Sequence, residues 1–160
     1  MLLDRTGEIE DRWVRVEEAP LPDGPVIVPL PMLGEVEHEP LGVELPNNVD
    51  PAEVLPRLGR VELVSVDFPS FADGRGFSIA RRLRSLGYKG RLRAAGPVIA
   101  DQFTYLLECG FDEVEVPEHV AVRQPAELWL AQLGRIGLGY QRGRIGRVSI
   151  LDQRRAARHG

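Results

Sequence analysis

Residues 61–95 read VELVSVDFPSFADGRGFSIARRLRSLGYKGRLRAA and decide the class of the fold. Val61–Val66 is almost continuously apolar, as expected for a strand that is covered on both faces. Apolar residues then recur at helical spacing over about 74–86, and Gly87 is a natural end for this helix. A second short strand is predicted at 91–95. A strand, a crossover helix and a further strand together predict two parallel strands.

The same alternation continues on both sides of this unit. Further strands are predicted at 41–45 and 111–116, and further helices at 51–59, 97–109 and 125–133. The order β-α-β-α-β-α-β-α predicts an α/β fold, with a small parallel sheet of about four strands joined by crossover helices. We expect an open sheet with helices on both faces. The alternative is a half-barrel, which a second copy of the chain would complete.

The pattern divides the chain into three parts. Residues 1–40 are expected to form an irregular N-terminal arm, because their prolines keep any strand, such as one at 26–28, short or at an edge. Residues 41–134 are expected to form the α/β domain, whose last helix is predicted to end at Gly134. Residues 135–160 are predicted to be a basic C-terminal tail.

Composition excludes several classes of function. The 160 residues contain no apolar run of about 18 residues that would span a membrane. The first residues lack the apolar core of a signal peptide, so a cytoplasmic protein is expected. One cysteine and three scattered histidines give no metal or redox spacing, so neither a metal nor a cofactor is expected. Residues 1–60 hold thirteen acids against five arginines, which disfavours nucleic acid as a partner.

Candidate site residues follow from the rule that ligands bind beyond the carboxyl ends of parallel strands. The turn Asp73-Gly74-Arg75 comes after the strand at 61–66 and opens a helix. Its glycine, the free amides of the helix and the Arg75 guanidinium would together suit a small oxyanion. The alternative is structural: Asp73 caps the helix, and Arg75 pairs with Asp67 or Asp101.

Acids at the same edge are candidates for catalysis. Asp67 and Asp73 would serve as an acid and base pair, although an acid at a strand end is as often an anchor for a loop. Asp101 and Gln102 open the next helix. We expect them close to the Asp73 turn, because adjacent crossovers bring successive helix starts to the same rim. Cys109, after two leucines in the last turn of a helix, is expected to be buried and unreactive.

The motifs around this turn resemble those of a known family. Asp67-Phe-Pro-x-Phe71-x-Asp-Gly-Arg75-x-Phe-Ser78 is similar to the signature of a bacterial domain-of-unknown-function family. The resemblance covers about residues 41–116 and includes Leu83-Arg84, Gly87-Tyr88-x-Gly90, Leu92-Arg-Ala94, Asp101-Gln102 and Cys109-Gly-Phe-Asp112. Members are often described as oxidoreductases of sulfite reduction, and their genes commonly lie beside genes for assimilatory sulfite and sulfate reduction.

The resemblance implies a pathway, cysteine biosynthesis through sulfite, but no mechanism. We therefore expect an accessory protein that binds a small anion or a partner, such as sulfite reductase or another sulfate-assimilation protein; a homodimer is compatible with this. The ligand-binding candidates are Gly74, Arg75, Ser78, Arg93, Asp101 and Gln102. The alternatives are an enzyme of unknown reaction with carboxylates at the strand rim, or an oxidoreductase whose cofactor leaves no motif.

Overall fold

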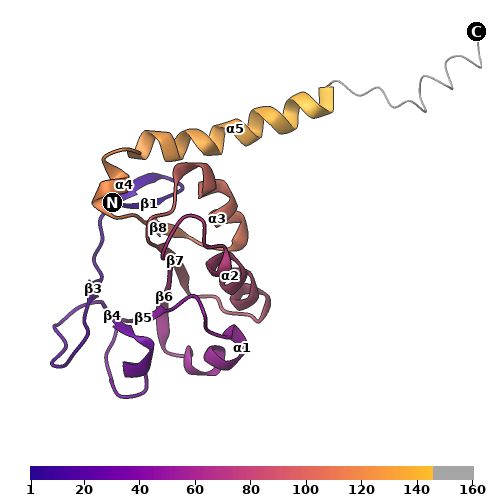
Figure 1. The fold of residues 1–160 in the computed structure, drawn as a ribbon. Coiled ribbons are helices and arrows are strands. Elements are labelled where there is room, and N and C mark those ends of the chain that lie inside the picture. Colours follow the sequence, from indigo (N-terminus) through magenta and orange to yellow (C-terminus); the bar gives the residue numbers. More distant parts are fainter. Residues whose placement is uncertain (146–160) are drawn as a thin grey trace, which may run out of the picture.

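One curled sheet of eight strands forms the centre of the computed structural model, which describes residues 1–145, with side chains up to residue 135 (Figure 1). The strands lie in the order β2-β1-β8-β7-β6-β5-β4-β3. The six strands β3 to β8 are parallel to one another, whereas β1 is antiparallel to both β2 and β8. The bounds are β1 Leu2–Asp4, β2 Gly7–Ile9, β3 Val14–Arg15, β4 Val26–Pro29, β5 Leu41–Leu45, β6 Val61–Asp67, β7 Arg91–Ala95 and β8 Glu113–Glu115.

The sheet is larger than the sequence predicts. The four predicted strands correspond to β5, β6, β7 and β8, and their parallel pairing is confirmed. The prediction of an irregular N-terminal arm is wrong, because residues 2–29 supply four further strands, two of which form an antiparallel hairpin. β1, β2 and β3 are only two or three residues long, which is too short for an alternating pattern to stand out in the sequence.

Three helices connect the strands β5 to β8. Asp50 caps the first of them as predicted, because its carboxylate accepts a hydrogen bond from the Ala52 amide at 2.9 Å. Gly110 ends the third in the left-handed region, with φ of 109°. The bounds are α1 Pro51–Val54, continued by the 3-10 helix η2 Leu55–Arg57; α2 Arg75–Ser85; and the 3-10 helix η3 Ala100–Gln102, continued by α3 Phe103–Cys109.

Three more helical elements lie outside these connections: η1 (Leu30–Met32), α4 (Glu118–Ala121) and α5 (Ala126–Ile145). The prediction that the last helix ends at Gly134 is wrong, because one glycine costs a helix only about 1 kcal/mol. The tail predicted from residue 135 therefore begins inside α5, and its residues 146–160 lie outside the described part of the chain. No helix within residues 1–145 is both long and apolar enough to cross a membrane.

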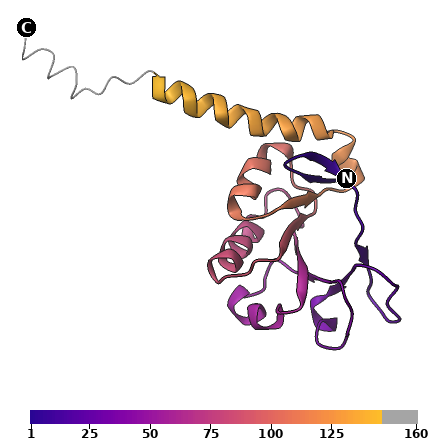
Figure 2. The same cartoon turned by 180° about the vertical axis from the view of Figure 1, so that it is seen from behind.

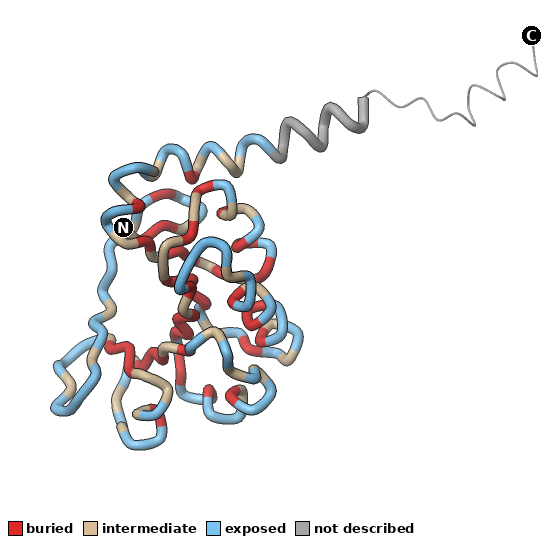
Figure 3. Tube along the Cα trace, in the orientation of Figure 1, coloured by how far each residue is buried: buried red, intermediate tan, exposed pale blue. Residues whose placement is uncertain are grey.

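The helices α1, α2 and α3 all cover the convex face of the sheet (Figures 1 and 2). The parallel strands follow one another in sequence order, so each right-handed crossover returns on the same side. The sheet is open, as expected, and curls into a half-barrel, but the prediction of helices on both of its faces is wrong. The core lies between this face and the helices, and Figure 3 shows buried segments there. Val64, Leu83 and Leu106 are among its residues.

The concave face is crossed by a short segment, residues 10–13, which we call the strap. It connects β2 to β3, the two opposite edges of the sheet. Asp11 of the strap contacts Arg93 of β7, and the ring of Trp13 packs over Gly42 of β5, where an added Cβ would lie 3.2 Å from the ring. The strap thus fills part of the space that the other half of a closed barrel would occupy.

Candidate functional site

A row of polar side chains crosses the concave face. Glu44, Ser65, Arg93 and Glu113 stand in register on β5, β6, β7 and β8. Their sequence neighbours, such as Val64 on β6, point to the helix side and belong to the core. Three members of the row, Ser65, Arg93 and Glu113, are buried. Because successive side chains of a strand alternate between faces, the row forms one continuous polar layer inside the half-barrel.

Arg93 is the centre of this layer and is 1% exposed. Its Nε donates to Glu113 at 2.8 Å, and its Nη1 donates to Glu115 at 3.0 Å. Nη1 and Nη2 also donate to the two carboxylate oxygens of Asp11 at 2.9 and 3.0 Å. Burial alone would lower the pKa of Arg93, but the hydrogen bonds to Asp11 and Glu113 outweigh it and raise this pKa. The predicted ligand-binding residue Arg93 is therefore fully engaged within the protein.

Arg15 of β3 extends the layer to the far edge of the sheet. It pairs with Glu44, donates to Glu115 at 2.6 Å and lies 3.3 Å from the Ser65 hydroxyl. The Oε2 atom of Glu115 accepts from both Arg15 and Arg93, so one carboxylate joins the two arginines. Sequence reasoning missed Arg15. Strand β3 has only two residues, so the sequence does not indicate that the Arg15 side chain contacts residues of β5 and β8.

A hollow of about 370 Å³ lies at the carboxyl ends of β3 to β6, above the polar layer. We call it the rim hollow. Asp67, a predicted catalytic residue, lines it at the end of β6, where the rule for parallel sheets places ligands. Asp73, the other predicted catalytic residue, is not among its lining residues. The lining consists of Arg15, Val16, Glu17, Ile27, Pro29, Leu30, Pro31, Glu44, Pro46 and Asp67.

Asp73 is instead engaged within its own turn. Its Oδ1 accepts from the amide and Nε of Arg75 at 3.1 and 3.0 Å, and its Oδ2 accepts from Nη2 at 2.6 Å. Asn47 donates to the same Oδ2 at 2.8 Å. The hydrogen bonds from Arg75 hold the pKa of Asp73 well below its ordinary value. Asp73 thus binds the first amide of α2 from the position before the N-cap residue, which is close to the structural alternative, but Arg75 pairs with Asp73 and not with Asp67 or Asp101.

A second hollow, also about 370 Å³, lies beside α2 on the helix side of the sheet; we call it the α2 hollow. It brings together Arg75 and Ser78, two of the predicted ligand-binding residues, with Arg82, which sequence reasoning missed. The spacing 75, 78 and 82 is that of one helix face and would have pointed to it. The lining consists of Asn47, Asn48, Val49, Pro51, Arg75, Ser78, Ile79 and Arg82.

Gly74, Asp101 and Gln102 line neither of these hollows. Gly74 immediately precedes α2 as its N-cap residue. Gln102 accepts from the Ile99 amide at 3.1 Å and donates to the carbonyl of Phe71 at 2.7 Å, so it fixes the loop that leads to the Asp73 turn. Asp101 accepts a hydrogen bond of 3.4 Å from Gln132 of α5. These two side chains therefore connect neighbouring elements at the rim.

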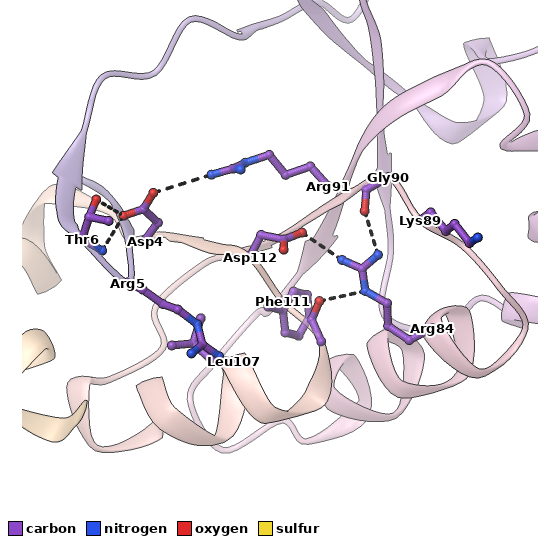
Figure 4. A pocket seen from close by; sticks show the side chains of 11 residues that line it. Asp4, Arg5, Thr6, Arg84, Lys89, Gly90, Arg91, Leu107, Phe111 and Asp112 are labelled. Carbon is purple, nitrogen blue, oxygen red and sulfur yellow. Dashed lines mark hydrogen bonds and ion pairs between the residues drawn. The ribbon is translucent and has the colours of Figure 1, made fainter. Parts of the chain in front are cut away.

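A third hollow, of about 740 Å³, lies at the amino ends of β7 and β8, beside the turn of the β1–β2 hairpin (Figure 4). Arg84 forms one wall of it. Its guanidinium donates to the carbonyls of Tyr88, Gly90 and Gly110 at 2.8–3.0 Å and to Asp112 at 2.8 Å. The carbonyls of Tyr88 and Gly110 follow the ends of α2 and α3, where a cation is favoured. Arg84 therefore holds the fold together at this edge.

The candidate residues do not form a metal centre. Within the part of the chain that the structure describes, no three side chains of His, Cys, Asp or Glu come together as metal ligands would. Cys109 is buried, as predicted, and accepts a hydrogen bond from Arg81 at 3.2 Å.

Comparisons with known proteins extend the sequence resemblance. Neither the curated proteins nor the solved structures gave a match to this chain. One family model matches residues 42–150. This stretch includes all residues that line the α2 hollow, and Glu44, Pro46 and Asp67 of the rim hollow. The chain therefore belongs to the family described as "Bacterial protein of unknown function (DUF934)".

Proposed function

We propose that this protein serves assimilatory sulfite reduction by binding, and that the α2 hollow holds a small oxyanion such as sulfite. One observation carries the proposal: the eight lining residues include two arginines, a serine and two asparagines, and none of the eight has a carboxylate. Guanidinium, hydroxyl and amide groups are the donors that bind oxyanions in proteins. Sulfite has three oxygens and can accept from several of them at once.

The surroundings of the α2 hollow favour an anion in a second way. Arg75, which lines the hollow, is the first residue of α2, and Ser78 and Arg82 line the hollow from the same helix. Asp73 binds Nε and Nη2 of Arg75 and so fixes the direction of the guanidinium, which leaves Nη1 for a ligand. Arg82 and Ser78 are exposed and have no hydrogen bond from their side chains within the described residues.

The pathway, the cytoplasmic location and the partner belong to the same proposal and rest on the family resemblance. A partner such as sulfite reductase, or another sulfate-assimilation protein, would receive the anion from an exposed site. Both arginines of the hollow lie on the surface, which suits such a transfer.

Calorimetric titration of the purified protein with sulfite and with sulfate tests the binding. We expect sulfite to bind, Arg82→Gln to weaken binding about tenfold or more, and Arg75→Lys to weaken it through loss of the planar fork. Arg123→Gln is the matched control, because Arg123 is exposed and lies away from the hollow. Absence of sulfite binding, or equal binding by Arg82→Gln, refutes the proposal.

Growth of a deletion strain tests the pathway. The strain is supplied in turn with sulfate, sulfite, sulfide and cysteine as the only sulfur source. A role in sulfite reduction predicts growth on sulfide and cysteine and a defect on sulfate and sulfite. Normal growth on all four sources contradicts the assignment to this pathway.

The rim hollow favours an enzyme as the second candidate function. Asp67 lies at the carboxyl end of a central strand, and no hydrogen bond or ion pair reaches its side chain from the described residues. An unpaired carboxylate in that position suits acid or base chemistry. Loss of function in the deletion strain carrying Asp67→Asn, with the fold intact, would favour this candidate.

A further inference from the structure

The rim hollow has a charge imbalance that the proposed function does not use. It lies on the concave side of the sheet, whereas the α2 hollow lies on the helix side, so the two are independent. Three of its lining residues, Glu17, Glu44 and Asp67, carry carboxylates, and one, Arg15, is basic. Arg15 already contacts the carboxylates of Glu44 and Glu115.

The polar layer beneath the hollow does not correct this imbalance. Arg93 contacts three carboxylates, those of Asp11, Glu113 and Glu115. Each arginine of the layer is thus shared among several acids, and none is left to face Asp67. The side chains of Asp67 and Glu17 have neither a hydrogen bond nor an ion pair with any residue that the structure describes. The concave face therefore carries excess negative charge at the mouth of the rim hollow.

The remaining walls of the rim hollow are apolar. Val16, Ile27 and Leu30 line it together with three prolines, Pro29, Pro31 and Pro46. Rigid apolar walls around a few charged groups are typical of sites for small organic molecules. A bare metal ion would need several oxygens converging on one point, and the described residues provide no such group of three.

We propose that the rim hollow binds a small organic ammonium compound, with its amine on Asp67 and its apolar body against the three prolines. The amine supplies the positive charge that this side of the protein lacks. A hydrogen bond between an ammonium and a carboxylate is stronger than one between neutral groups. The position at the carboxyl ends of β3 to β6 is where parallel sheets bind their ligands. This assignment does not depend on oxyanion binding at the α2 hollow.

A matched pair of probes tests the proposal: 2-phenylethylamine and the uncharged 2-phenylethanol. Binding is followed by NMR chemical shifts of the full chain at physiological ionic strength. We expect the amine to shift resonances of the rim hollow and the alcohol to bind about tenfold more weakly or not at all. Asp67→Asn removes the charge with little change of shape, and should weaken amine binding by a similar factor.

Glu62→Gln is the control, because Glu62 is an exposed carboxylate on the same strand as Asp67 and outside the hollow. Amine binding should survive Glu62→Gln. Three results would overturn the proposal: equal binding of amine and alcohol, amine binding unchanged in Asp67→Asn, or shifts at Asp67 caused only by magnesium or calcium ions. Failure of the sulfite titration has no bearing on this experiment, since it concerns other residues and a ligand of opposite charge.

Discussion

Replacement of Arg93 by methionine tests whether the polar layer is a structural unit. Methionine keeps most of the side-chain volume and removes the charge. The variant leaves Glu113, which is 2% exposed, with Arg91 as its remaining partner. Glu115 keeps its 2.6 Å contact with Arg15, and Asp11 lies near enough to the surface to be solvated. The cost therefore arises mainly at Glu113.

Breaking a buried ion pair on one side costs about 3–5 kcal/mol. Since Glu113 keeps one arginine, we expect the lower end, about 3 kcal/mol, which lowers the Tm by roughly 10 °C in a chain of this length. Urea unfolding gives the free energy directly. Trp13 lies in the strap beside this layer, so in a Trp129→Phe background its fluorescence reports whether the strap is released before the rest unfolds.

The double variant Arg93→Met/Glu113→Met separates charge from packing. Removal of both charges should recover more than about half of the lost stability, because no buried carboxylate is left without its partner and Asp11 is partly exposed to water. A loss below about 1 kcal/mol in the single variant, or no recovery in the double variant, would refute the reasoning and would mean that water reaches Glu113 freely.

Three further predictions concern the backbone, acid stability and the cysteine. Gly96→Ala should cost about 2–4 kcal/mol in urea unfolding, because its φ is +138° and an added Cβ would lie 2.0 Å from the carbonyl oxygen of Phe68; Gly59→Ala, at an open position, should cost less than 1 kcal/mol. Burial raises the pKa of Asp11, but its hydrogen bonds to an arginine and to a backbone amide outweigh this and lower it. Asp11 therefore stabilises the fold above about pH 4 and loses this effect as the pH falls further, so Asp11→Asn should flatten the acid side of a stability–pH profile. Cys109 should react with a thiol reagent far more slowly in the native protein than in the unfolded chain; equal rates would show that its burial is not maintained in solution.

The sequence predicted the local elements well and the distant pairings poorly. The strands and helices between residues 41 and 116 could be predicted from the spacing of apolar residues and from the glycines and prolines that end each element. Strand β1 pairs with β8, more than a hundred residues later, and a single sequence contains no signal for such a pairing. For this reason the sequence analysis predicted an irregular arm where the structure has the N-terminal strands.

The same limit applies to the candidate sites. Asp67 and Arg93 were named from the strand rule and the family motif, and both lie on the concave face. Their surroundings depend on Asp11 and Arg15, which come from the part of the chain that the sequence did not place. The positions of residues on one helix can be predicted from their spacing in the sequence. The spacing of Arg75 and Arg82 would therefore have sufficed to place both side chains on the face of α2 that lines the α2 hollow.

The pairing of β1 with β8 affects the order in which the sheet can form while the chain is being synthesised. β1 and β2 are made before the rest of the sheet, but β1 can pair with β8 only after β8 has been made. Until then Leu2 and Leu3, both buried in the finished protein, have no partner strand on that side. The helical crossovers between β5 and β8 close short loops and can form during translation, whereas the N-terminal hairpin must wait for the growing sheet. The strands β1 and β2, although made before β8, thus join the sheet after it, and with them the strap that covers the concave face.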